Sequence, residues 1–467
     1  MISKFKYILK LYLLALIALL LSSDAFSQLS SGGTPLLFAN PGLFRNESIV
    51  RLEHPDAQML ELEDYKNESS GFPERMGVTI PVNLNPSTSG QVSSLVDGSK
   101  IWTTVISVEG AVGLGLYFSD FKLPAGARLF IFSQDKKQVI GAFTEKNNKP
   151  DGLFSTEIIK GENITLEYFE PNGSFSSSPF TISEVLYVYK PMYFAGERNL
   201  KGSNSGSCEV NMSCSEGDNW RKQGKSVVRI QIKNGNAAYW CTGTIINNTA
   251  GDFSPLVLTA DHCARSFSET YATPSDVAQW IFYFLYETQS CDDETVEASK
   301  SLTGAVKLAS SSPNGNDGSD FYLVTLNEPI PASYEPFYAG WSRTGEMSPA
   351  GVGIHHPAGD VKKISTYTAP LTSSEWGDVA GTHFRVVWSA TENGHGVTEG
   401  GSSGSPVFDN MGRLIGQLTG GESGCSNLTG PDYYGKLAFS WESNGIADSV
   451  RLKPWLDPLN TGLTSIN

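Results

Sequence analysis

The segment Gly400-Gly401-Ser402-Ser403-Gly404-Ser405-Pro406 places three serines in a glycine-rich turn. Two earlier segments supply other reactive side chains: Leu258-Thr259-Ala260-Asp261-His262-Cys263 and Ser319-Asp320-Phe321-Tyr322-Leu323. A serine hydroxyl is a poor nucleophile at neutral pH, so it needs a base within hydrogen-bond reach. The base in turn needs a partner that fixes its tautomer. The three segments together therefore predict an activated serine nucleophile, and none of them would be specific alone.

His262 is the candidate base. It precedes Cys263, and a disulfide at Cys263 would hold the imidazole in place; the obvious partner is Cys241 on a preceding predicted strand. Asp320 is the candidate group that orients the base, because it heads an apolar run and would lie shielded from water at the edge of a core. Asp317 is the alternative, but it lies in a softer glycine-rich loop.

Ser403 is the candidate nucleophile. Gly401 and Gly404 flank it and permit backbone conformations that other residues avoid. Such a turn can aim the N–H groups of Gly401 and Ser403 at one point, which is the geometry of an oxyanion hole. Ser402 and Ser405 are alternative nucleophiles, but neither has glycines at both of those offsets. Taken alone, the segment is also compatible with a purely structural hairpin loop.

Residues 1–28 are typical of a signal peptide. Three lysines precede the apolar run Leu11–Leu21, which is too short to span a bilayer comfortably. We therefore expect a mature protein that is exported to the periplasm or the extracellular space and has no membrane segment.

The six cysteines all lie in the C-terminal part of the chain. An even number in an exported chain favours three disulfides, and the absence of a Cys-x-x-Cys pair argues against a metal site. The predicted serine chemistry requires no metal and no cofactor. The net charge of −15 argues against nucleic acid as a partner, since such binders need a basic surface.

Residues 29–201 are predicted to form a pro-region without a catalytic constellation. Pro and Gly interrupt residues 29–95, where no periodicity is sustained. From about residue 95 the chain contains short runs rich in β-branched and aromatic residues, which predict a β-sandwich. The runs are residues 101–108, 127–132 and 164–169.

Residues 202–467 are predicted to form the catalytic domain, which is all-β with paired barrels. Residues 196–207 are polar and rich in Gly and Ser, which is the composition of an exposed linker with Lys201 in its middle. A helix is expected only near Ala447–Trp455. The predicted strands are residues 226–232, 241–246, 255–260, 321–326 and 414–418.

The catalytic domain resembles the bacterial lysyl endopeptidases, which are secreted serine proteases of the chymotrypsin fold. The resemblance covers residues 203–465 and implies a double β-barrel with His262, Asp320 and Ser403 as the catalytic triad. It also implies a monomer acting on protein or peptide substrates. The motifs that carry it are Gly206-Ser207-Cys208, residues 258–263, Ile354-His355-His356-Pro357, residues 397–406, Gly416-Gln417-Leu418, Tyr434-Gly435 and Trp455-Leu456-Asp457-Pro458.

Six cysteines allow fifteen pairings. The resemblance implies the pairs Cys208–Cys425, Cys214–Cys291 and Cys241–Cys263. Composition alone could not select among them.

The resemblance also implies a substrate pocket for lysine. Trypsin-like enzymes carry an aspartate six residues before the nucleophile, where this chain has Val397. Here Asp432 matches the pocket carboxylate of the family, and Glu399 matches a second acidic residue. The family also stacks a histidine on a tryptophan; Trp376 is retained, but Thr419 replaces the histidine before Gly420. This departure weakens the expected preference for lysine over arginine.

The resemblance also bears on activation. Ser402 cannot form the ion pair with a freed N-terminus that activates animal trypsin-like enzymes, so we expect activation by removal of the pro-region, acting as intramolecular inhibitor or chaperone. An enzyme that cleaves after lysine could release itself at Lys201.

Two alternatives remain. One is a protease of other specificity, for instance for glutamate, which would need a basic or polar pocket base. The other is a catalytically silent binding module, which would lack a triad member. The pair His355-His356 is interpreted as structural, and His383 and His395 lie in no motif.

Overall fold

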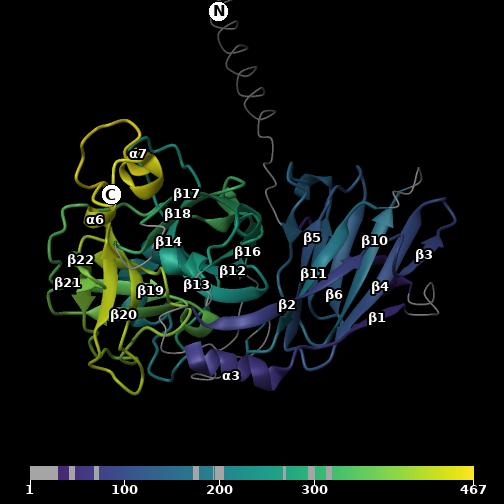
Figure 1. The fold of residues 1–467 in the computed structure, drawn as a ribbon, viewed down its shortest axis with the longest axis horizontal. Helices are drawn as coiled ribbons and strands as arrows, with labels where there is room; N and C mark the ends of the chain where they lie inside the picture. Colours follow the sequence, from purple (N-terminus) through teal and green to yellow (C-terminus); the bar gives the residue numbers. More distant parts are fainter. Residues whose placement is uncertain are drawn as a thin grey trace, which may run out of the picture.

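The computed structural model describes residues 30–40, 48–67, 73–171, 178–192, 194, 204–266, 270–292, 300–311 and 318–467. The predicted signal peptide, Lys201 and Asp317 lie outside the described residues. Figure 1 shows two β-rich parts side by side. Residues 29–201, the predicted pro-region, are purple to blue, and residues 202–467, the predicted catalytic domain, are teal to yellow. None of the described helices is long and apolar enough to cross a membrane.

The pro-region is a sandwich of two sheets around one apolar core that includes Trp102, Phe118 and Leu166. This confirms the predicted sandwich-like architecture. One sheet contains β1 (Ile49–Leu52), β3 (Gln91–Ser94), β4 (Lys100–Val108), β6 (Arg128–Ser133), β7 (Val139–Phe143) and β10 (Asn163–Glu170). The facing strands are β2 (Arg75–Leu84), β5 (Gly113–Ser119), β8 (Phe154–Ser155), β9 (Ile159–Lys160) and β11 (Thr181–Val188).

The sandwich begins earlier than the sequence predicts, because β1, β2 and β3 all precede residue 95. The proline in β2 obscures that strand in the sequence, since proline cannot donate to a β-ladder. In the structure Pro81 faces Glu184 of β11, where the register shifts and a bulge interrupts the ladder. A bulge is one of the few places where a strand tolerates proline.

The catalytic domain has two barrel-like groups of seven strands, each around its own core, so the all-β double-barrel prediction is confirmed. The first contains β12 (Val227–Asn234), β13 (Ala237–Ile245), β14 (Leu256–Ala260), β15 (Ile281–Phe284), β16 (Lys300–Thr303), β17 (Ala305–Ser310) and β18 (Phe321–Leu326). The second contains β19 (Gly351–His355), β20 (Lys363–Tyr367), β21 (Thr372–Trp376), β22 (Val379–Val386), β23 (Pro406–Asp409), β24 (Leu414–Gly421) and β25 (Asp432–Lys436).

The helices are short. The prediction of one helix over Ala447–Trp455 is wrong, because two separate short helices, η7 and α7, lie there instead. Pro454 explains the break, since proline fits only in the first turn of a helix. The α-helices are α2 (Leu36–Ala39), α3 (Ala57–Asn67), α4 (Arg221–Gly224), α5 (Pro274–Val277), α6 (Leu437–Ser440) and α7 (Lys453–Leu456). The 3-10 helices are η2 (Glu145–Asn147), η3 (Ser215–Trp220), η4 (Asp261–Ala264), η5 (Ala332–Tyr334), η6 (Pro357–Gly359) and η7 (Asp448–Val450).

Strand β2 joins the two parts into one 12-stranded sheet, because it lies between β11 of the pro-region and β13 of the first barrel. The pairing with β13 is antiparallel, with Val78 opposite Ala237 and Gly77 opposite Ala238. Figure 1 shows β2 running from the sandwich toward the catalytic domain. Apolar side chains of both parts pack over this junction: Met76, Tyr117, Ile158, Leu186 and Val188 from the pro-region, and Ala238, Trp240, Ile281, Tyr283 and Val361 from the catalytic domain.

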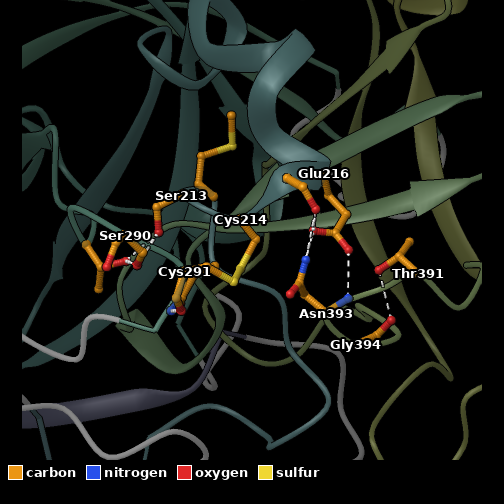
Figure 2. The surroundings of a disulfide bond; sticks show 12 residues. Ser213, Cys214, Glu216, Ser290, Cys291, Thr391, Asn393 and Gly394 are labelled. Carbon is orange, nitrogen blue, oxygen red and sulfur yellow. Dashed lines mark hydrogen bonds between the residues drawn. A yellow bond between two sulfur atoms is a disulfide. The ribbon is translucent and has the colours of Figure 1, made fainter.

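The first residues of the catalytic domain are tied to both barrels. The structure contains a Cys214–Cys291 disulfide, and the Glu216 carboxylate beside it accepts hydrogen bonds from the backbone and side-chain N–H groups of Asn393 at 2.9 and 2.8 Å, as Figure 2 shows. Burial disfavours the charged carboxylate, but these hydrogen bonds outweigh it and lower the pKa of Glu216 to about 2.

The last part of the predicted exposed linker is only partly exposed, because residues 204–206 are buried or half-buried. Ser205 is buried and donates a hydrogen bond to Asp360 at 2.6 Å. The Gly206 N–H donates to the Glu399 carboxylate at 2.9 Å. Polar composition indicated a linker, but these two acceptors hold the segment against the second barrel.

The close approach of β2 and β11 predicts the effect of Gly77→Ala. An added Cβ would lie 2.6 Å from the Tyr187 carbonyl oxygen, whereas the same change at Gly115 meets nothing nearer than 3.4 Å. We expect Gly77→Ala to lower the unfolding free energy of the full chain by about 1–3 kcal/mol and Gly115→Ala to change it little. Denaturant unfolding in a Ser403→Ala background measures both, and equal midpoints for the two variants would contradict the predicted tight junction.

Candidate active site

His262 lies where the first barrel faces the second. Strand β14 ends at Ala260, and His262 follows in the short helix η4. The Cys241–Cys263 disulfide ties η4 to β13 and fixes the backbone beside the imidazole. The structure also contains disulfides between Cys208 and Cys425 and between Cys214 and Cys291, so its three pairs are those that the family resemblance implies.

His262 and Asp320 form a buried pair. The Nδ1 atom of His262 lies 2.7 Å from Oδ2 of Asp320, and the His262 backbone N–H donates to Oδ1 at 2.9 Å. Asp320 has a positive φ of 56°, a conformation that is uncommon for residues other than glycine. The loop before β18 is held there by the second barrel, because the Gln417 side-chain amide donates to the Ser319 carbonyl at 2.5 Å.

The surroundings of Asp320 keep it ionised. Burial raises its pKa, but the charge of His262 and the two hydrogen bonds from His262 lower the pKa overall. An ionised Asp320 accepts only, so Nδ1 of His262 carries the proton in this pair. That tautomer leaves Nε2 as an acceptor, and this buried atom has no hydrogen-bond partner among the described residues. It is available to accept a proton from a serine.

The turn that carries Ser403 is attached to the first barrel near His262. The Thr242 N–H of β13 donates to the Ser403 carbonyl at 2.8 Å, and Sγ of Cys263 lies 3.7 Å from the same oxygen. Gly404 packs so tightly that an added Cβ would lie 2.1 Å from the Thr259 hydroxyl. These contacts place Ser403 beside η4, which carries His262, but no hydrogen bond joins the Ser403 hydroxyl to Nε2 of His262 in this structure.

The oxyanion-hole prediction concerns Gly401 and Ser403. Gly401 has a φ of +88°, which favours glycine. The Ala358 N–H binds the Gly400 carbonyl at 2.5 Å. Because C=O and N–H of a trans peptide point in opposite directions, this contact turns the Gly401 N–H away from Ala358. Neither amide donates a hydrogen bond to any described residue, so both remain available to a substrate oxygen.

Ser402 forms a hydrogen bond with His355, a residue that the sequence pattern predicts to be structural. Nδ1 of His355 lies 2.8 Å from the Ser402 hydroxyl, and Nε2 lies 3.0 Å from the Ser365 hydroxyl. Burial lowers the pKa of His355 to about 3, so the ring is neutral. His356 instead contacts the Asp360 carbonyl at 2.9 Å. Nothing in the motif Ile354-His355-His356-Pro357 indicated that His355 contacts Ser402.

Asp432 is a buried carboxylate at the start of β25. Its Oδ2 accepts hydrogen bonds from Trp388, Thr398 and Ser423 at 2.6, 2.7 and 2.6 Å. Its Oδ1 accepts only the Ser423 N–H, at 3.2 Å. Burial raises the pKa of Asp432, these hydrogen bonds offset part of that rise, and no described Lys or Arg forms an ion pair with it.

The other predicted pocket residues divide into two groups. Trp376 lies against Gly420, where an added Cβ would be 3.3 Å from the indole, and Thr419 contacts His383 at 2.9 Å. Glu399 instead binds the Gly206 N–H and is therefore occupied by the start of the catalytic domain. In the described part of the chain, no group of three or more His, Cys, Asp or Glu side chains could hold a metal ion.

The pro-region reaches this site. An added Cβ on Gly400 would lie 3.2 Å from the Glu74 side chain, which immediately precedes β2. A cleft of about 120 Å³ lies at the same junction. Residues of both parts line it: Glu74, Arg75, Met76, Lys190, Pro191, Asn204, Trp240 and Ala358.

Known proteins similar to this chain include a lysyl endopeptidase from Pseudomonas aeruginosa, which is 28% identical over 421 residues, covering 85% of this chain and 86% of that protein. Among solved structures, the thermostable serine protease AL20 from an extremophilic microorganism is 14% identical, with a TM-score of 0.34, over 46% of this chain and 92% of that one. Protease Anisep from Arthrobacter nicotinovorans is 18% identical, with a TM-score of 0.33, over 45% of this chain and 90% of that one.

The family model of the lysyl endopeptidase C-terminal domain matches residues 202–435. The match spans the segments that carry His262, Asp320 and Ser403, together with Asp432. Because it covers half of the chain, and because the full-length relative is a lysyl endopeptidase, the chain belongs to the lysyl endopeptidase family of serine endopeptidases.

Proposed function

We propose that this protein is a secreted endopeptidase that cleaves peptide bonds after lysine through the triad Ser403, His262 and Asp320. The Ser403 hydroxyl attacks the scissile carbonyl while Nε2 of His262 takes its proton. Asp320 holds the imidazole in the required tautomer and stabilises the imidazolium that forms. The N–H groups of Gly401 and Ser403 bind the oxyanion. His262 then gives its proton to the leaving amine, and water releases the acyl group from Ser403 by the same steps.

The observation that carries the lysine preference is the buried Asp432 carboxylate. Neutral donors occupy Oδ2, but Oδ1 accepts only one backbone N–H, although a carboxylate oxygen can accept two hydrogen bonds. A buried carboxylate without a cation is unfavourable, and a substrate ammonium would remove that penalty. An apolar or acidic substrate side chain would leave it unpaired, which gives discrimination. A glutamyl specificity does not fit this site, since a second carboxylate would be repelled.

The surroundings of Thr419 bear on whether the enzyme prefers lysine or arginine substrates. The Thr419 hydroxyl lies 2.9 Å from Nε2 of His383. Trp376 of β21 packs on Gly420, the residue that follows Thr419 on β24. We propose that Asp432 selects a basic side chain and that arginine is a weaker second substrate.

The variant Asp432→Asn tests this assignment, because it keeps the shape and removes the charge. We expect kcat/KM for a lysyl amide substrate to fall by about 30- to 4,000-fold, which is the range for losing one partner of a buried charge pair. The rate of Ser403 labelling by a small neutral phosphonate should stay within a few-fold.

The matched control is Asp378→Asn, which makes the same change of charge in an exposed turn of the second barrel. It should leave kcat/KM unchanged. If Asp432→Asn cleaves lysyl substrates as well as the parent enzyme does, the carboxylate does not select lysine.

We further propose that the pro-region is an intramolecular inhibitor that covers the leaving-group side of the active site. Strand β13 passes the nucleophile at Thr242, and β2 pairs with the same strand at Ala237 to Tyr239. Asp432 belongs to the second barrel, so a substrate with its lysine at Asp432 would extend beyond the scissile bond toward β13. Glu74 and the first residues of β2 occupy that space.

Polar contacts add to the apolar packing at this interface. Lys233 of β12 forms ion pairs with Glu184 of the pro-region at 3.0 Å and with Asp276 at 3.2 Å. Lys149 donates a hydrogen bond to the Thr303 carbonyl at 2.6 Å. Because these contacts do not involve the linker, cutting the linker alone would leave the pro-region bound. We therefore propose that activation requires its removal and not the insertion of a new N-terminus.

Two lysyl substrates test the inhibitor proposal on the freshly purified, uncut full chain, with gel analysis to verify that it stays uncut. One is a peptide amide with a small dye as leaving group, and the other carries four residues after the lysine. For each substrate, the activity of the uncut chain is divided by the activity of the mature enzyme. We expect this ratio to be at least tenfold lower for the longer peptide than for the dye amide. Equal losses on both substrates would contradict a block on the leaving-group side.

A further inference from the structure

We propose that His355 is a positioning residue of the active site, which holds the Ser402 hydroxyl and, through Ser402, the Ser403 N–H of the oxyanion hole. The inference rests on the proposed function, because Ser402 matters only if its neighbour Ser403 is the nucleophile. The mechanism above uses neither His355 nor Ser402.

The His355 ring lies between two serine hydroxyls, and all three side chains are buried. Nδ1 is 2.8 Å from the Ser402 hydroxyl, and Nε2 is 3.0 Å from the Ser365 hydroxyl of β20. The Ser365 hydroxyl donates to the Val397 carbonyl at 2.8 Å. At the other end, the Glu399 N–H donates to the Ser402 hydroxyl at 3.2 Å. A continuous series of hydrogen bonds therefore connects β20 to the turn that carries the nucleophile.

The order of the strands brings His355 to both serines. In the antiparallel pair of β19 and β20, His355 is opposite Lys363 and Gly353 is opposite Ser365. Alternate residues of a strand point to the same face, so Ser365 lies diagonally across from His355 on one face of the sheet. Strand β19 also pairs with β23, which begins at Pro406, directly after the nucleophile turn. The turn and the histidine are therefore carried by neighbouring strands.

Counting protons gives each of these hydrogen bonds a direction. The single hydroxyl proton of Ser365 is donated to Val397, so Ser365 can only accept from His355. Nε2 of His355 therefore carries the ring proton, and Nδ1 of the neutral ring is an acceptor. The Ser402 hydroxyl must then donate to Nδ1 while its oxygen accepts the Glu399 N–H. Both the tautomer of His355 and the orientation of the Ser402 hydroxyl are fixed.

The interaction between His355 and Ser402 joins two neutral groups. Burial lowers the pKa of His355 to about 3, and the positive charge of Lys363 lowers it further. The nearest carboxyl group is that of Glu209, whose Oε2 lies 3.9 Å from Nε2. Burial and the neighbouring Glu399 raise the pKa of that carboxyl group. His355 therefore acts on Ser402 as a hydrogen-bond acceptor and not as a charge.

Holding Ser402 orients the Ser403 N–H, a proposed oxyanion donor. The Ser402 N–H donates to the Glu399 carbonyl at 3.0 Å, and the Ser402 carbonyl accepts the Ser405 N–H at 2.9 Å. The Ser402 carbonyl and the Ser403 N–H belong to one trans peptide and point in opposite directions. His355 adds a third attachment, through the side chain, that resists rotation of this peptide. Donors that are held in place before the reaction stabilise the oxyanion at no further cost.

The first test is Ser402→Ala in the mature enzyme, with kcat and KM measured on a lysyl amide substrate. The change removes the hydroxyl and little volume. We expect kcat to fall about 3- to 10-fold, the range for one lost hydrogen bond. KM should stay within twofold, because the oxyanion forms only in the transition state.

The matched control is Ser226→Ala. Ser226 is also buried, and its hydroxyl donates to the Gln223 carbonyl at 2.6 Å, before β12 of the first barrel. This variant loses a buried hydrogen bond away from the nucleophile turn, so it should keep the kcat and the KM of the parent enzyme. Losses of kcat that are equal in Ser226→Ala and Ser402→Ala would contradict a specific role for Ser402.

Two His355 variants and a double-mutant cycle test whether His355 acts through Ser402. His355→Leu removes the acceptor and should match Ser402→Ala, whereas His355→Asn keeps an acceptor near the place of Nδ1 and should recover part of the loss. In the Ser402→Ala background, His355→Leu should lower kcat by less than twofold more.

Two outcomes would overturn the proposal: equal losses from His355→Leu in both backgrounds, or a parental kcat in soluble Ser402→Ala enzyme. The second outcome is decisive even where His355→Leu does not fold. A parent enzyme without activity would instead contradict the proposed function itself.

Discussion

The hydrogen bond from the Thr242 N–H to the Ser403 carbonyl is the contact on which the arrangement of the site depends. It joins the nucleophile turn of the second barrel to β13 of the first. The same strand carries Cys241, whose disulfide holds the backbone beside His262, and it receives β2 of the pro-region three residues away. His262, Ser403 and β2 are thus all positioned by β13. Gly404 allows the turn to pack closely against this strand, because an added Cβ would lie 2.5 Å from the Thr242 carbonyl oxygen.

Three carboxylates lie in or beside the proposed site, and each has a different environment. Asp320 is buried and accepts two hydrogen bonds from His262, which lower its pKa. Asp432 is buried among neutral donors with no described Lys or Arg paired to it, which supports the proposed pairing with a cationic substrate group. Glu399 is occupied by the Gly206 N–H, which anchors the start of the catalytic domain before any cleavage.

Much of the fold followed from local sequence patterns. The run Phe321–Leu326 is a strand with the predicted bounds, and the glycine-serine turn lies beside His262, because β-branched runs and glycine turns act locally. Strand β2 was missed because its proline is tolerated at a bulge in the ladder with β11, a strand distant in sequence. The contact between His383 and Thr419 was missed for a similar reason, since the two residues lie on β22 and β24 and no spacing along the chain encodes such a contact. The family resemblance supplied the disulfide pairs and Asp432, which composition could not.

Covalent labelling tests whether the chain has an activated serine beside a pocket for lysine. The mature enzyme would be treated with a lysyl phosphonate and with its norleucyl counterpart, which has nearly the same shape but no charge, and the modified residue identified by peptide mass spectrometry. We expect one adduct, on Ser403, and a rate of its formation that is at least a hundredfold higher with the lysyl than with the norleucyl reagent. Modification of Ser402 or Ser405, or equal rates with the two reagents, would contradict it.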